Sequence, residues 1–129
     1  MYMGQHPAKA LRQYVAIDTG SRAEGASPHQ LVRMLFDELL FSLDAAALAL
    51  RGGDGHQCRD RQTRALAILH ALESSLDFER GGEIAINLAV IYRETRKRVL
   101  EATALNRAEP MEQARLFIAD IAEAWNQIG

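Results

Sequence analysis

The chain has 129 residues, with 48% hydrophobic residues, 25% charged residues and a formal net charge of −2. This length and composition fit one globular domain whose core needs no metal or disulfide, and they exclude a disordered or collagen-like chain. Glycine (9) and proline (3) are too sparse for a β-sandwich or barrel with a turn every dozen residues, and the charge lacks the basic excess of nucleic-acid-binding domains.

The first predicted element is a short helix over residues 8–15. Its apolar residues Leu11, Tyr14 and Val15 share one side. A helix of this length is unstable alone in water, so the segment must pack against another surface or stay unfolded. We therefore treat residues 1–16 as an N-terminal cap segment.

The next stretch, residues 17–26, contains two glycines and no hydrophobic periodicity. This pattern is typical of a connecting segment, and we interpret it as a tether. The remaining residues, 27–129, carry four long helical patterns and no strand pattern. The sequence thus predicts a single domain with a cap segment, a tether and a helical bundle.

The first long helix has clear start and stop signals. Ser27 suits the N-cap, Pro28 the first helical position, and Gln30 can complete a capping box. Its apolar pattern runs to Leu50 and stops at the glycine pair 52–53, where a glycine can adopt the left-handed conformation that ends helices.

Three more helices follow. The second begins between Asp54 and Asp60 and is expected to end at the glycine pair 81–82. The third starts at once with Glu83, and the fourth starts near residues 109–110. Short loops between long helices make neighbours antiparallel, so the sequence predicts an all-α, up-down four-helix bundle with a short N-terminal capping helix.

Two helices carry more apolar residues than one buried stripe requires. The first helix adds a second set to its regular pattern: Val32, Phe36, Leu40, Phe41, Ala47 and Leu48. The third has Ile84, Leu88 and Ile91 in one stripe, with Ile86 and Val90 about 160–200° away. A neighbouring helix, the cap segment, a second subunit or a partner chain could cover these faces. Permanent cover by the cap segment and an interaction site remain equal alternatives.

The sequence offers little for catalysis or metal binding. Cys58 is the sole cysteine, which predicts a free thiol in a reducing cytosol. His70 and Glu73 form one reversed pair, too few ligands for a metal site, and we expect no cofactor and no enzyme activity. The basic clusters at 59–64 and 93–98 are interpreted as solvated faces, so no nucleic-acid partner is expected. No apolar run approaches the ~20 residues of a membrane span, so neither membrane insertion nor secretory export is expected.

Several segments resemble the flagellar secretion chaperones of the FliS type. Residues 26–37 are similar to the first-helix motif of that family, and residues 76–88 to a second motif that includes the string Gly-Gly-Glu-Ile-Ala-Ile-Asn-Leu. Residues 91–92, residues 124–125 and Tyr14 match further family positions. The resemblance covers nearly the whole chain in order.

The resemblance implies a cytoplasmic chaperone that works without nucleotide. Members of the family hold the disordered C-terminal segment of flagellin, prevent its premature polymerisation and assist its delivery to the flagellar export apparatus. In the free family fold, the N-terminal segment caps part of the client surface. An alternative hypothesis is a structural or regulatory bundle that self-associates through its apolar faces, and a homodimer is possible.

The partner-binding residues that we expect come from the cap segment, the first helix and the third helix: Leu11, Tyr14, Leu35, Ile86, Asn87, Val90 and Tyr92. Core packing is the alternative for each apolar member. Asn87 could bond a partner's backbone or be satisfied within the bundle, and Trp125 is expected in the core. We also hypothesise that the cap segment is a plug on the surface near Ile86 and Val90, displaced by the client. The alternative is that it contacts the client directly.

Overall fold

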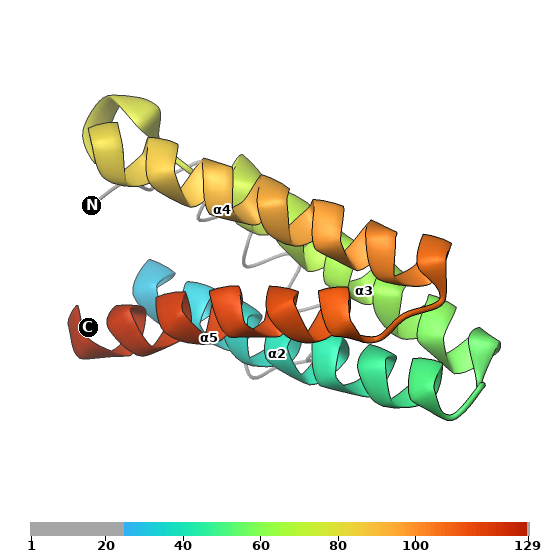
Figure 1. The fold of residues 1–129 in the computed structure, drawn as a ribbon. Coiled ribbons are helices and arrows are strands. Elements are labelled where there is room, and N and C mark those ends of the chain that lie inside the picture. The colour runs from blue at the N-terminus through green and yellow to red at the C-terminus, as the bar shows by residue number, and fades with distance from the viewer. Residues whose placement is uncertain (1–24, 129) are drawn as a thin grey trace.

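A computed structural model describes residues 25–128 as four antiparallel helices (Figure 1). The helices are α2 (Pro28–Arg51), α3 (Gly55–Ser74), α4 (Phe78–Leu105) and α5 (Glu109–Ile128). The expected all-α bundle is therefore confirmed for these residues, and the part of the chain that the structure describes contains no strand. The predicted capping helix, with Leu11 and Tyr14, lies outside the described residues.

Both predicted signals at the ends of α2 are confirmed. The Ser27 hydroxyl accepts a hydrogen bond from the Gln30 N–H at 3.1 Å, and the Gln30 side-chain oxygen accepts one from the Ser27 N–H at 2.9 Å. These reciprocal bonds form the expected capping box. At the other end Gly52 caps the helix, and Gly53 has a φ of 75°, the left-handed conformation that glycine adopts readily. Asp54 then caps α3.

The predicted end of the second helix at glycines 81–82 is wrong. α3 ends at Ser74, eight positions earlier on the chain than Gly82. The cause is Asp77, whose carboxylate accepts two backbone N–H hydrogen bonds at 3.1 Å and so starts a new helical turn. Gly82 interrupts that turn with a φ of 49° and a ψ of −124°, and regular helix resumes at Glu83, the predicted start of the third helix.

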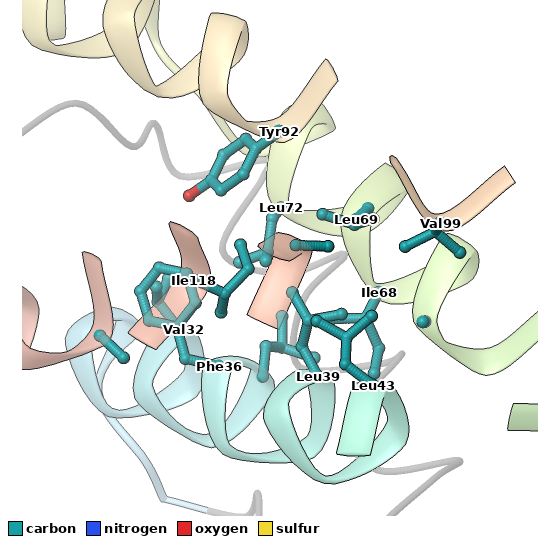
Figure 2. Close-up of a cluster of buried hydrophobic side chains, with 14 of the residues drawn as sticks. Val32, Phe36, Leu39, Leu43, Ile68, Leu69, Leu72, Tyr92, Val99 and Ile118 are labelled. Carbon is teal, nitrogen blue, oxygen red and sulfur yellow. The ribbon is translucent and has the colours of Figure 1, made fainter. Parts of the chain in front are cut away.

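α2 lies between α3 and α5, while α4 packs more closely on α5 than on α3. This position explains the surplus apolar residues of α2, because the helix buries side chains against both neighbours. Val32 (3% exposed) and Phe36 (1%) belong to the core, whereas Phe41 and Leu48 remain exposed. Figure 2 shows side chains from all four helices meeting in one cluster.

Trp125 joins the last turns of α5 to the first turns of α2. Its indole N–H donates to the His29 carbonyl at 3.0 Å, and the His29 ring Nε2 lies 2.9 Å from the Trp125 carbonyl, as a donor in the matching tautomer. The two rings stack at 4.6 Å, and Phe36 meets the indole edge-to-face at 6.2 Å. Trp125 is 4% exposed, which confirms its predicted place in the core.

Replacement of this tryptophan should be among the most destabilising changes in the bundle. We expect Trp125→Ala to lower the free energy of unfolding by about 3–5 kcal/mol, because it leaves a cavity and removes both ring contacts. Urea denaturation followed by circular dichroism measures this. Leu48→Ala, at a position 74% exposed, is the control and should change stability by less than about 0.5 kcal/mol. Equal losses in the two variants would contradict the assignment of Trp125 to the core.

Candidate functional site

The outer face of α4 exposes apolar residues that a bundle helix would ordinarily bury. Ile86 is 53% exposed, Val90 58% and Leu100 46%. At 100° per residue, Val90 and Leu100 lie within about 40° of Ile86 around the helix. The basic residues Arg93 and Lys97 lie within the same range. We call these five residues the outer stripe of α4. Ile86 and Val90, two of the predicted site residues, are thus neighbours on an accessible surface.

Ile84 is exposed for a different reason. It lies about 160° from Ile86 around α4, on the side of Leu88, which is buried. Ile84 is nevertheless 58% exposed. In Figure 1 the first turns of α4 diverge from the last turns of α5, so the start of α4 lacks this neighbouring helix. The sequence places Ile84 in one apolar stripe with Leu88 and leaves its cover open, because amphipathic spacing does not report where a neighbouring helix ends.

Two other predicted site residues lie in the core. Leu35 and Tyr92 are each 2% exposed, so neither offers much surface to a partner in this conformation. Tyr92 lies at the edge of the buried cluster near Leu72 (Figure 2). Asn87, by contrast, is exposed and lies about 100° from Ile86 around the same helix. The structure therefore groups Ile86, Asn87 and Val90 on the surface and leaves Leu35 and Tyr92 beneath it.

A shared ion pair attaches α4 to α3 beside the stripe. The Glu73 carboxylate accepts a hydrogen bond from the Arg93 guanidinium at 3.0 Å and one from the Arg96 guanidinium at 2.7 Å. Burial alone would raise the pKa of Glu73, but the hydrogen bonds from Arg96 and Arg93 and their charges outweigh it, so the pKa lies below its ordinary value. Glu73 is thus a structural carboxylate that joins α3 to two arginines of α4.

Other exposed apolar residues lie on α2, on α5 and at the two ends of α4. Phe41 and Leu48 lie on α2, and the Arg61 guanidinium stacks over the Phe41 ring at 4.9 Å from its centroid. Leu116 lies on α5 and is 60% exposed. Leu100 and Leu116 did not stand out in the sequence. For Leu100 the signal was its spacing of 14 residues from Ile86, which returns to nearly the same side of a helix.

The described residues carry no arrangement typical of metal or thiol chemistry. No group of three or more potential metal ligands occurs within residues 25–128. Cys58 is buried, and that burial is the main cause of a raised thiol pKa, which disfavours the reactive thiolate. None of the four helices is long and apolar enough to cross a membrane. The exposed outer stripe of α4 is therefore the strongest candidate site, and its chemistry is that of a protein-binding surface.

Comparison with known proteins agrees with this interpretation. Residues 10–129 match the family model described as flagellar protein FliS. The flagellar secretion chaperone FliS of Salmonella typhimurium is 37% identical over 124 residues, which cover 95% of this chain and 92% of the relative. The proteins of the same name from Escherichia coli K12 and Vibrio cholerae are 31% and 30% identical, over 95% and 92% of this chain and 90% and 88% of the relatives. The resemblance noted in the sequence is confirmed across nearly its full length.

The lowered pKa of Glu73 predicts how its contribution to stability depends on pH. The ion pair stabilises the fold above the pKa that the group has when unfolded, and this contribution is lost as the pH falls through the lower pKa of the folded state. At pH 7, Glu73→Gln should lower the free energy of unfolding by about 1 kcal/mol or less, since the arginines are partly exposed. The gap from wild type should narrow as the pH falls below the pKa that Glu73 has when unfolded, in urea denaturation series. A gap that stayed constant throughout this acidic range would contradict this account. Glu123→Gln, exposed on α5, controls for the loss of a carboxylate elsewhere.

Proposed function

Because the chain belongs to the FliS family of flagellar secretion chaperones, we propose that its client is the disordered C-terminal segment of flagellin. In this role the protein works in the cytoplasm and without nucleotide. It masks the client segment, which would otherwise pair with other flagellin molecules. The client is then handed to the flagellar export apparatus, where unfolding competes with chaperone binding.

The exposed outer stripe of α4 is the observation that best supports this proposal. A disordered segment loses conformational entropy when it binds, and it must bury enough apolar surface to offset that cost. Ile86 and Val90 provide accessible apolar surface on a rigid helix, and Asn87 beside them offers an amide to an extended backbone. Interfaces formed by coupled folding commonly bury about 1,000–3,000 Å². The client must therefore also contact surface beyond these three residues.

The alternative function is self-association through the same apolar surface. Stoichiometry separates the two. A chaperone forms a complex of one protein with one client, whereas a self-assembling bundle changes mass with its own concentration. Isothermal titration calorimetry with the C-terminal flagellin segment of the same organism should give a 1:1 isotherm with favourable enthalpy, unfavourable entropy and a negative heat-capacity change. Absence of heat at several temperatures would favour the self-associating bundle.

A negative charge in the middle of the exposed apolar surface should strongly weaken client binding. Val90→Asp places a carboxylate between apolar side chains where the client would exclude water, and desolvation of this charge is costly. We expect affinity to fall at least about tenfold, with helicity unchanged because Val90 is 58% exposed. Calorimetry measures the first effect, and circular dichroism the second.

The matched control is Leu48→Asp, which makes the same kind of change at an exposed residue of α2. Its affinity for the flagellin segment should stay within about twofold of wild type. Equal binding by Val90→Asp and Leu48→Asp would remove the outer stripe from the client site. A loss of helicity in Val90→Asp would instead assign Val90 to the core.

The cap segment, residues 1–16, has a proposed regulatory role. Leu11 and Tyr14 lie outside the described residues, but the surface near Ile86 and Val90 is one that they could cover and that a client would compete for. Deletion of residues 1–16 should leave the bundle folded and tighten client binding, because the client no longer displaces the plug. Weaker binding would mean that the segment contacts the client directly. A collapsed fold in circular dichroism would contradict the plug.

A further inference from the structure

The outer stripe of α4 is not uniformly apolar. Two apolar residues, Ile86 and Val90, lie at its beginning and one, Leu100, near its end. The basic residues Arg93 and Lys97 lie between them on the same side of the helix, one turn apart. A purely hydrophobic client would have to bury both cations without a partner, which is costly. The stripe therefore requires opposite charge from whatever binds along its full length.

The cations of the stripe are only partly neutralised by the protein. Glu73 is a single carboxylate shared between Arg93 and Arg96, so this group of three keeps a net positive charge. The Arg93 side chain is also 63% exposed. Lys97 is exposed, and among residues 25–128 it makes no ion pair. Arg98 faces away from the stripe and pairs with Glu94.

The acidic charge of α5 strengthens the preference of the stripe for an acidic partner. Residues 93–98 carry four basic side chains and one acidic one, within a chain whose formal net charge is −2. α5, which packs beside α4, carries four acidic residues and one basic residue. An acidic segment would be attracted to the stripe and repelled by α5, and such complementarity fixes the register of an interface. Nucleic acid fits less well, because the stripe offers aliphatic side chains where bases would need aromatic ones for stacking.

We propose that the outer stripe binds a client segment that carries two carboxylates one turn apart, flanked on both sides by apolar residues. The carboxylates form charge-assisted hydrogen bonds with Lys97 and Arg93, about 6 Å apart along the axis, and the apolar residues cover Ile86, Val90 and Leu100. The inference deepens the proposed function and rests on it for the identity of the client.

Charge reversal at Lys97 tests this inference in the full-length protein. The C-terminal flagellin segment should bind Lys97→Glu about tenfold more weakly than wild type in 50 mM NaCl, and the difference should shrink in 500 mM NaCl because salt screens exposed charges. Lys97→Met keeps the apolar stem and should give an intermediate loss. Arg59→Glu makes the same reversal at an exposed position of α3 and should change affinity by less than about twofold.

A designed peptide makes the test independent of flagellin. It is an amphipathic helix whose leucines and two glutamates repeat the spacing of the five stripe residues, and its control replaces both glutamates with glutamine. Wild type should bind the glutamate peptide more tightly than the glutamine peptide, and Lys97→Glu should lose this preference. A peptide with lysine in place of the glutamates should bind Lys97→Glu better than wild type.

The outcomes separate the two proposals. Tight binding of the flagellin segment with equal affinities for Lys97→Glu and Arg59→Glu would overturn the charge requirement and leave the proposed function standing. If the flagellin segment does not bind but the glutamate peptide binds in a Lys97-dependent way, flagellin is overturned as the client and the charge requirement is supported. If neither the flagellin segment nor the glutamate peptide binds, both proposals are overturned.

Discussion

The apolar residues of α2 cover more of its circumference than one neighbouring helix can bury, and the rest of the molecule follows from this constraint. Two helices must flank α2, and α3 and α5 take those places. α4 is then left to pack mainly on α5, with fewer contacts to α3. A helix at the periphery of a bundle keeps an open outer face, and on α4 that face carries Ile86 and Val90. The candidate site is thus exposed because α3 and α5, rather than α4, bury the apolar faces of α2.

Local chemistry made much of the fold predictable. Ser27 and Gln30 identified the start of α2, and Gly53 its end, because caps act over a few residues and need no tertiary context. The end of α3 was missed because Asp77 starts a new turn before the glycine pair, and a short capped turn leaves no hydrophobic periodicity to detect. The helix boundary was therefore decided by one carboxylate.

The site was predictable only in part, since spacing identifies a helix face but not its cover. Ile86 and Val90 form a second apolar face in the sequence, and the structure leaves that face exposed. Leu35 and Tyr92 were expected at the same site but are buried in the core. Which of two apolar faces is buried depends on the neighbouring helices, and this information lies in the packing of distant segments. The basic residues 93–98 were interpreted as an ordinary solvated face, because only the structure shows how Glu73 divides its charge between Arg93 and Arg96.

The Trp125 contact gives the molecule an intrinsic optical reporter. The chain contains one tryptophan, so all indole emission arises from the point where the end of α5 meets the start of α2. The indole is stacked on the His29 ring and shielded from solvent, and separation of these two helix ends would expose it to water and alter both its intensity and its emission maximum. Opening of this end of the bundle, as during transfer of a cargo or mechanical unfolding, can therefore be followed in the unlabelled protein.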